Sequence, residues 1–167
     1  LQYGIPSYKL GKDVVEAEID VMRQMGVEIK TGVEVGKDVT LGALREQGYK
    51  AFYLAIGCGA GRLPGVPGED AEGAMTAIDY LHDANTGRTS FSGSVVVIGG
   101  GNVAIDAARV SSRSGASDVM MFSLESEKEM PASDEEVREA REDGVAIQNG
   151  WGPKEVLTQD GRVTGIM

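Results

Sequence analysis

The stretch "VVVIGGGNVAID", residues 95–106, places three consecutive glycines between an apolar run and a segment with helical spacing. The apolar residues before the break predict a buried strand, and the pattern after it predicts a helix from Asn102 to about Ser114. Because the glycines fall at the junction, the chain can turn there sharply from strand to helix. Such a junction leaves the first backbone N–H groups of the helix free to bind a ligand.

Residues 99–104 fit the pattern G-x-G-x-x-A in the setting that gives it meaning, after a strand and at the start of a helix. There Gly99 allows the tight turn, Gly101 lets the backbone approach a diphosphate, and Ala104 lets the helix pack closely on the strand. The pattern therefore predicts dinucleotide binding at the helix N-terminus, and a turn that serves only packing is the alternative. The predicted contacts are Gly99, Gly100, Gly101, Asn102, Val103 and Ala104.

Helices and strands alternate along the rest of the C-terminal part. The sequence predicts a helix over residues 77–84, a second strand over 118–124, a helix over 133–144 and a strand over 145–150. Ser133 and Glu136 form a capping box at the start of the last helix. This alternation predicts an α/β fold, a Rossmann-like domain with a parallel sheet.

The N-terminal part also alternates between the two patterns. It predicts a helix over residues 12–25, one or two short strands over 27–36, a short helix over 41–47 and a buried strand over the apolar run "KAFYLAIG", 50–57. A Gly- and Pro-rich stretch follows at residues 58–73, with the expected hinge near Gly65. We therefore expect two domains, residues 1–65 and residues 66–167.

The end of the second strand decides which dinucleotide binds. Glu125 lies 125 − 104 = 21 residues past Ala104, near the ~20 residues expected for an acid that binds the ribose hydroxyls. Lys128 is the one basic residue in "MMFSLESEKEMPA". A carboxylate repels a 2′-phosphate, so NAD is favoured over NADP. The alternative is that Glu125 and Glu127 are solvated loop acids.

Composition excludes several classes of function. Lys and Arg number 16 against 26 Asp and Glu, a net charge of 16 − 26 = −10, and no basic stripe points to nucleic acid or an anionic membrane. No apolar run approaches the ~20 residues that span a bilayer. The single Cys58 excludes an internal disulfide, and no Cys/His set has metal-site spacing. We expect a cytoplasmic protein without a metal site.

Several longer segments resemble a known family. They are "YGIPSYKLGKDVVEAEID", "YLAIG", "PGVPGEDAEG", "VIGGGNVAIDAAR" and "EMPAS" followed by "EEVREAREDGV". On these the chain resembles the small (beta) subunit family of glutamate synthase, FAD- and NAD(P)-binding oxidoreductases. Relatives of that family include dihydropyrimidine dehydrogenase and, more distantly, adrenodoxin reductase.

The resemblance implies an FAD domain interrupted by an inserted NAD(P)H domain. Residues 1–65 would be the middle of the FAD-binding domain, also Rossmann-like, and residues 66–167 most of the NAD(P)-binding domain. The family has two glycine fingerprints and this sequence has one. The chain starts at Leu1 and stops soon after a turn signal at Asp160-Gly161, so we expect an internal piece of a longer protein that binds FAD poorly or not at all.

The resemblance also implies roles for particular residues. Two segments would approach the flavin, one near its isoalloxazine ring and one where the chain crosses to the second domain. Asp106, in the pattern N-x-A-x-D, would either orient the glycine loop or contact the ligand. The implied flavin contacts are Tyr3, Gly4, Ile5 and Pro6 in the first segment and Ala55, Ile56 and Gly57 in the second.

One departure from the family bears on the cofactor. The family carries Tyr-Arg-Arg after the second strand, with the arginines on the 2′-phosphate of NADPH, and the matching residues here are Ser123, Leu124 and Glu125. This agrees with the preference for NAD inferred from Glu125. A glycine at Gly11 replaces the family's proline and loosens a helix start.

The implied reaction is hydride transfer from NAD(P)H to FAD, with electrons passing on to an iron–sulfur centre or a partner such as the glutamate synthase large subunit. The cofactors carry that chemistry, so no catalytic side chain is predicted. We expect the chain alone to be inactive. The alternative is a non-catalytic NAD-binding docking or regulatory module.

Overall fold

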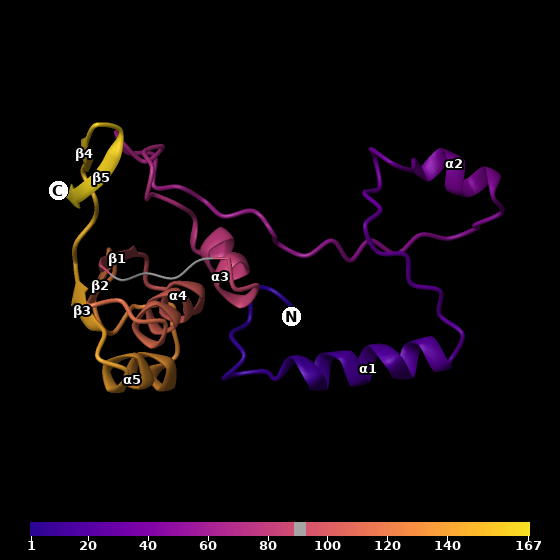
Figure 1. Cartoon of the computed structure of the whole chain (residues 1–167), viewed down its shortest axis with the longest axis horizontal. Helices are drawn as coiled ribbons and strands as arrows, with labels where there is room; N and C mark the ends of the chain where they lie inside the picture. The colour runs from indigo at the N-terminus through magenta and orange to yellow at the C-terminus, as the bar shows by residue number, and fades with distance from the viewer. Residues whose placement is uncertain (89–92) are drawn as a thin grey trace. The chain divides into compact units, whose positions relative to one another are not determined.

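A computed structural model describes residues 1–88 and 93–167 (Figure 1). Contacts divide the chain into two compact units. One unit consists of Leu1–Gly11 with Ala60–Met167, and the other of Lys12–Gly59. The elements are α1 Lys12–Gln24, α2 Leu41–Glu46, α3 Ala77–Asn85, β1 Ser94–Ile98, α4 Asn102–Arg113, β2 Asp118–Ser123, α5 Asp134–Glu142, β3 Ala146–Asn149, β4 Val156–Gln159 and β5 Arg162–Ile166.

A parallel sheet organises the larger unit. Its three strands lie in the order β1-β2-β3, with Val97 opposite Met121 in the first pair and Met121 opposite Ile147 in the second. Helix α4 connects β1 to β2 and packs on both, and α5 packs beside α4 (Figure 1). The α/β class with a parallel sheet is thus confirmed, and all these elements lie where the sequence predicts them to within a few residues.

Helix α4 packs on two of its sides, against the sheet on one and against α3 on another. Ile105 and Ala108 are fully buried against the sheet together with Met121. On another side of the helix, Ala107 packs against Leu81 of α3. Alanines dominate the buried surface of α4, so its neighbours can approach the helix axis closely.

A hairpin of β4 and β5 closes the larger unit. Asp160 and Gly161 both have positive φ, 51° and 77°, as a type I′ turn requires. The turn expected at this dipeptide is therefore confirmed. The hairpin also bonds to the segment before α3, because Glu72 exchanges backbone hydrogen bonds with Gly161 and Val163.

The smaller unit contains the two predicted helices but not the predicted strands. Residues 27–36 and 50–57 form no strand in the structure, so these two predictions are wrong. In the second run the side chains of Tyr53, Leu54 and Ile56 are 93%, 71% and 89% exposed. A strand needs a neighbouring strand to bond its N–H and C=O groups, and the described part of the smaller unit pairs none with this run.

The N-terminal segment is fixed to the larger unit by charge. Lys9 Nζ lies 2.5 Å from Asp106 Oδ1 on α4 and 2.5 Å from Glu136 Oε1 on α5. The ring of Tyr8 lies beneath two guanidinium groups, those of Arg109 at 4.6 Å and Arg113 at 4.4 Å from its centroid. Segment Leu1–Gly11 thus bridges α4 and α5.

Arg109 joins α4 to α5 from a buried position. Arg109 is only 4% exposed. Its Nε donates to Asp143 Oδ2 at 2.7 Å, and its Nη1 donates to Glu139. Partial burial raises the pKa of Asp143, but hydrogen bonds from Arg113 and Arg109 outweigh it, and the net pKa lies below the usual value. The carboxylate therefore stays charged and keeps the pairing intact at neutral pH.

Replacing Arg109 with methionine should lower the free energy of unfolding of the larger unit by about 2 kcal/mol. This is less than the loss for a wholly buried pair, because its carboxylate partners reach solvent. Urea unfolding followed by the fluorescence of Trp151, the single tryptophan, measures the change. Arg138→Met is the matched control, since Arg138 contacts Glu135 and Glu142 only at 3.7 and 3.8 Å on the surface of α5. Equal losses in both variants would contradict the role given to Arg109.

Candidate functional site

The glycine loop joins β1 to α4 by a turn that a larger residue would strain. Gly99 has φ 135°, and a Cβ built on it would lie 3.4 Å from the Cβ of Ala104. Its N–H donates to the carbonyl of Phe122 at 2.9 Å, which extends the pairing of β1 with β2. The structure thus confirms the predicted strand, tight turn and closely packed helix.

Gly101 leaves open space at the start of α4. It is the N-cap residue, with φ −93° and ψ 169°, and no side chain caps the helix there. A Cβ on Gly101 would have no atom within 4 Å, and Asn102 and Val103 beside it are exposed. The unpaired N–H groups of a helix's first turn, together with the helix dipole, favour an anion at this place.

Gly100 is where the loop meets the end of β2. A Cβ there would lie 2.5 Å from Ser123 Oγ, 2.7 Å from Glu125 Oε2 and 3.3 Å from the Cδ of Pro131. Its carbonyl accepts a hydrogen bond from the N–H of Ala132 at 3.0 Å. The loop therefore lies directly against the Ser123 and Glu125 side chains, which would have to move to make room for a Cβ on Gly100.

Asn102 supports the loop from within the helix. Its Oδ1 accepts a hydrogen bond from the N–H of Ser133 at 3.1 Å, and Ser133 in turn caps α5. Sequence reasoning assigned Asn102 to the ligand and missed residues 131–133 as a brace for the loop. The signal was the segment "PAS", which combines a rigid proline, a small residue and a helix cap.

Glu125 lies against the glycine loop, as the Gly100 distances show. Ser123, fully buried at the end of β2, donates from Oγ to Glu125 Oε2 at 2.6 Å, and the N–H of Gly150 donates to the Glu125 carbonyl at 3.1 Å. The Ser123 hydrogen bond and the residue's own N–H lower the pKa of Glu125. An ionised, oriented carboxylate is thus brought next to a loop 25 residues earlier in the chain.

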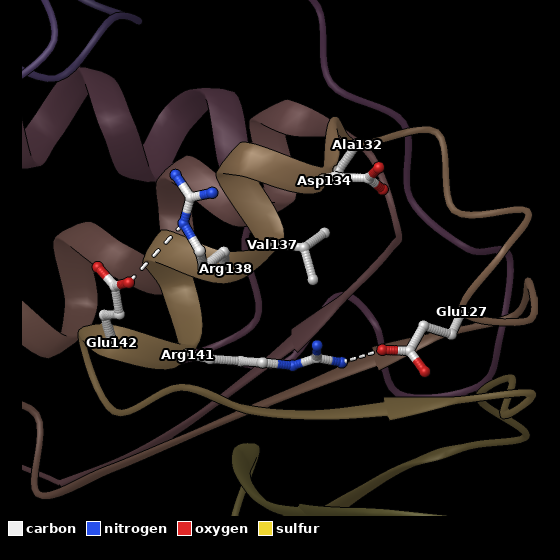
Figure 2. A pocket seen from close by; sticks show the side chains of 7 residues that line it. All are labelled: Glu127, Ala132, Asp134, Val137, Arg138, Arg141 and Glu142. Atoms are coloured by element: carbon white, nitrogen blue, oxygen red, sulfur yellow. Dashed lines mark hydrogen bonds and ion pairs between the residues drawn. The ribbon is translucent and has the colours of Figure 1, made fainter.

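A hollow of about 510 Å³ lies between α5 and the turn that follows Glu125 (Figure 2). Figure 2 shows the Arg141 side chain reaching from α5 to Glu127, where Nη2 and Oε1 are 2.6 Å apart. The residues that line the hollow are Glu127, Ala132, Asp134, Val137, Arg138, Arg141 and Glu142. Sequence reasoning missed Arg141, because it lies 16 residues beyond Glu125 on another element.

The residues expected near the flavin fall in two units. In the larger unit, Asn85 Nδ2 of α3 donates to the carbonyl of Tyr3 at 2.5 Å, and the Tyr3 ring lies 4.9 Å from the ring of His82. Pro6 is buried, Ile5 is half-buried and Gly4 is exposed. Ala55, Ile56 and Gly57 lie in the smaller unit, exposed and outside any strand.

Asp106 faces the N-terminal segment through its ion pair with Lys9. This contact joins α4 to the N-terminal segment and is neither of the two roles expected for Asp106, which both stay predictions. Within residues 1–88 and 93–167, no group of three or more His, Cys, Asp and Glu side chains could hold a metal ion. Across the same residues, no helix is both long and apolar enough to span a membrane.

Comparison with known sequences gives a family and several relatives. The model of the pyridine nucleotide-disulphide oxidoreductase family matches residues 6–166. The chain is 39% identical over 170 residues to the NADP(+)-dependent formate dehydrogenase subunit beta of Moorella thermoacetica, covering 99% of this chain and 24% of that protein. It is 37% identical over 180 residues to the glutamate synthase [NADPH] small chain of Escherichia coli, covering 99% and 38%. The resemblance to the glutamate synthase small-subunit family is confirmed.

A solved structure shares the fold. FprA, an oxidoreductase of Mycobacterium tuberculosis, superposes with a TM-score of 0.76 at 18% identity, over 99% of this chain and 52% of the other. The chain spans between a quarter and two fifths of the length of the two curated relatives above. The match over residues 6–166 shows that the chain belongs to the pyridine nucleotide-disulphide oxidoreductase family.

Proposed function

We propose that the chain is the nicotinamide-dinucleotide-binding part of an FAD-dependent oxidoreductase and that it favours NAD(H) over NADP(H). One observation carries the proposal: Gly101 leaves open space over the N-terminus of α4, at the carboxyl end of a parallel strand. Ligands of open α/β sheets bind at this end of the strands, and phosphates bind at helix N-termini. The diphosphate would rest on the loop of residues 99–103.

The ribose would lie at Glu125. Its carboxylate is held by Ser123 and lies beside Gly100, so it can accept hydrogen bonds from ribose hydroxyls next to a diphosphate on the loop. Because Ser123 and the residue's own N–H lower its pKa, the carboxylate is ionised at neutral pH. A 2′-phosphate brought to this place would meet a like charge. The names of the relatives mention NADPH, so this preference would set the chain apart from them.

The bound nicotinamide would supply hydride chemistry, and the chain's own residues would hold and orient the dinucleotide. No acid or base side chain is required of the chain for that step. For FAD, the residues present do not form a site, since Ala55, Ile56 and Gly57 are exposed in a run without a strand. No step through FAD is therefore assigned to this chain.

The proposal assigns different cofactors to the two parts of the chain. Residues 66–167 would form the NAD(P)-binding domain, and residues 1–65 would belong to an FAD-binding domain completed by further chain. In the whole protein, FAD would be held with the help of further chain, and an iron–sulfur centre or partner subunit would receive the electrons; the names NADPH-Fe(3+) oxidoreductase subunit beta and glutamate synthase small chain of two relatives suggest such acceptors. By itself the chain would bind nucleotide without turnover.

Gly101→Ala tests the diphosphate contact. The methyl group should weaken NADH binding about tenfold or more, because it fills the space that a diphosphate would use. Its cost in stability should stay below about 1 kcal/mol, as for alanine at an N-cap, because φ and ψ suit alanine. Fluorescence titration of Trp151 with NADH measures binding, and urea unfolding measures stability. Gly93→Ala, where a Cβ also meets no atom within 4 Å but at the opposite end of β1, should leave binding unchanged.

Glu125→Gln tests the cofactor preference. The unchanged chain should bind NADH more tightly than NADPH, and the variant should bind NADH about tenfold more weakly, since a charged hydrogen bond to the ribose is lost. The ratio of the NADPH to the NADH dissociation constant should therefore be smaller for the variant than for the unchanged chain. Glu129→Gln removes the same charge from the same turn, where Glu129 accepts from Ser126, and is the control. Tighter binding of NADPH by the unchanged chain would contradict the proposal.

Purification tests the statement about FAD. The isolated chain should show no flavin absorbance and should gain none on incubation with FAD, because the run over residues 50–57 offers no ordered flavin contact. The same sample should still bind NADH, which controls for correct folding of the larger unit. A yellow protein with stoichiometric flavin would show instead that the chain completes its own FAD site.

A further inference from the structure

The turn after Glu125 carries a second carboxylate that the proposed dinucleotide site does not use. Glu127 lies two residues beyond Glu125, in a turn closed by the hydrogen bond from the N–H of Glu129 to the carbonyl of Ser126 at 3.0 Å. Its Oε1 accepts from Arg141 Nη2 at 2.6 Å (Figure 2). The tertiary structure therefore brings a guanidinium to the segment after β2, where the sequence itself contains no arginine between residues 114 and 137.

Arginine at this place would suit a phosphate. In dinucleotide-binding folds an arginine near the end of the second strand accommodates the 2′-phosphate of NADP, and the planar guanidinium binds phosphate through two hydrogen bonds. Arg138 lies one turn before Arg141 on α5 and lines the same hollow. Both guanidinium groups thus border a space of about 510 Å³ beside the turn that follows Glu125.

We propose that Glu127 neutralises Arg141 and so prevents it from binding a 2′-phosphate, which makes Glu127 a second determinant of the preference for NAD(H). This rests on the proposed function, in which the ribose lies at Glu125. The two carboxylates act differently. Glu125 accepts hydrogen bonds from the ribose hydroxyls, whereas Glu127 forms an ion pair with the guanidinium that a phosphate would need. Glu127 does not touch the dinucleotide in this scheme and acts through Arg141.

The exposure of the pair makes it reversible. The side chains of Arg141 and Glu127 are 48% and 63% exposed, so the interaction is weak and the guanidinium is accessible from solvent. A phosphate monoester carries nearly two negative charges and competes for Arg141 once the carboxylate is gone. Removing Glu127 should therefore raise affinity for NADPH while leaving affinity for NADH almost unchanged.

A double-mutant cycle tests the inference. The chain and its variants Glu127→Gln, Arg141→Gln and the double substitution are titrated with NADH and with NADPH at fixed low salt, with Trp151 fluorescence as the readout. Trp151 is a suitable reporter because its backbone N–H donates to the carbonyl of Ser123, which places the residue at the same end of β2. Glu127→Gln should tighten NADPH binding about threefold to tenfold and change NADH binding less than twofold. The gain should vanish in the double variant.

Glu129→Gln separates unmasking from a general loss of negative charge. It removes one charge from the same turn, but Glu129 accepts from Ser126 and holds no arginine there. An equal gain for NADPH in Glu129→Gln, or a gain that persists in the double variant, would overturn the inference. The inference would also be overturned if the unchanged chain and all variants bound NADH but Glu127→Gln bound NADPH no more tightly than the unchanged chain. Absence of NADH binding by the unchanged chain would instead contradict the proposed function, and the inference would fall with it.

Discussion

The close approach of Gly100 to the end of β2 is the constraint on which the larger unit depends. A single added carbon there would overlap Ser123 and Glu125. Beside this contact, the carbonyl of Gly100 accepts a hydrogen bond from the N–H of Ala132, and Asn102 Oδ1 accepts one from the N–H of Ser133. These contacts fix the start of α4 to the start of α5. The oriented carboxylate of Glu125 and the open space over Gly101 are two consequences of the same packing.

Charge plays two structural roles in a chain that is strongly acidic overall. Buried Arg109 and Lys9, whose side chain is 22% exposed, form ion pairs with carboxylates of α4, α5 and the loop after α5, and these pairs join the N-terminal segment to both helices. On the opposite side of α5, Arg141 pairs with Glu127 near the solvent. The first cluster stabilises the fold because it is largely buried and connected, whereas the second is exposed to solvent and contributes little to stability.

The proposed preference for NAD(H) illustrates how a family fold can carry different cofactors. The scaffold that binds a diphosphate consists of backbone amides and glycines, which are indifferent to the 2′ position of the ribose. Discrimination is left to the few side chains after β2. Under the proposal, these side chains would be a buried serine, an ionised glutamate held by it, and a glutamate paired with an arginine from α5.

The sequence by itself determined the strand, glycine turn and helix around residues 94–113, the N-cap of α5 at Ser133 and the hairpin turn at Asp160-Gly161. These depend on local backbone preferences and on periodicity, which short segments carry within themselves. It also placed Glu125 near the loop, because the length of a βαβ unit is nearly fixed. The same reasoning failed at residues 27–36 and 50–57, because the pattern of apolar residues shows that a segment can be buried but does not identify the strand that would pair with it.

Only the tertiary structure decided the pairs that hold the site together. Lys9 with Asp106, Asn102 with Ser133 and Arg141 with Glu127 join residues that lie 97, 31 and 14 positions apart. No spacing rule connects them, because each contact depends on how two elements pack and not on either element alone. The sequence therefore identified the loop that would hold a diphosphate, and the packing of α5 beside α4 decided which charges lie near it.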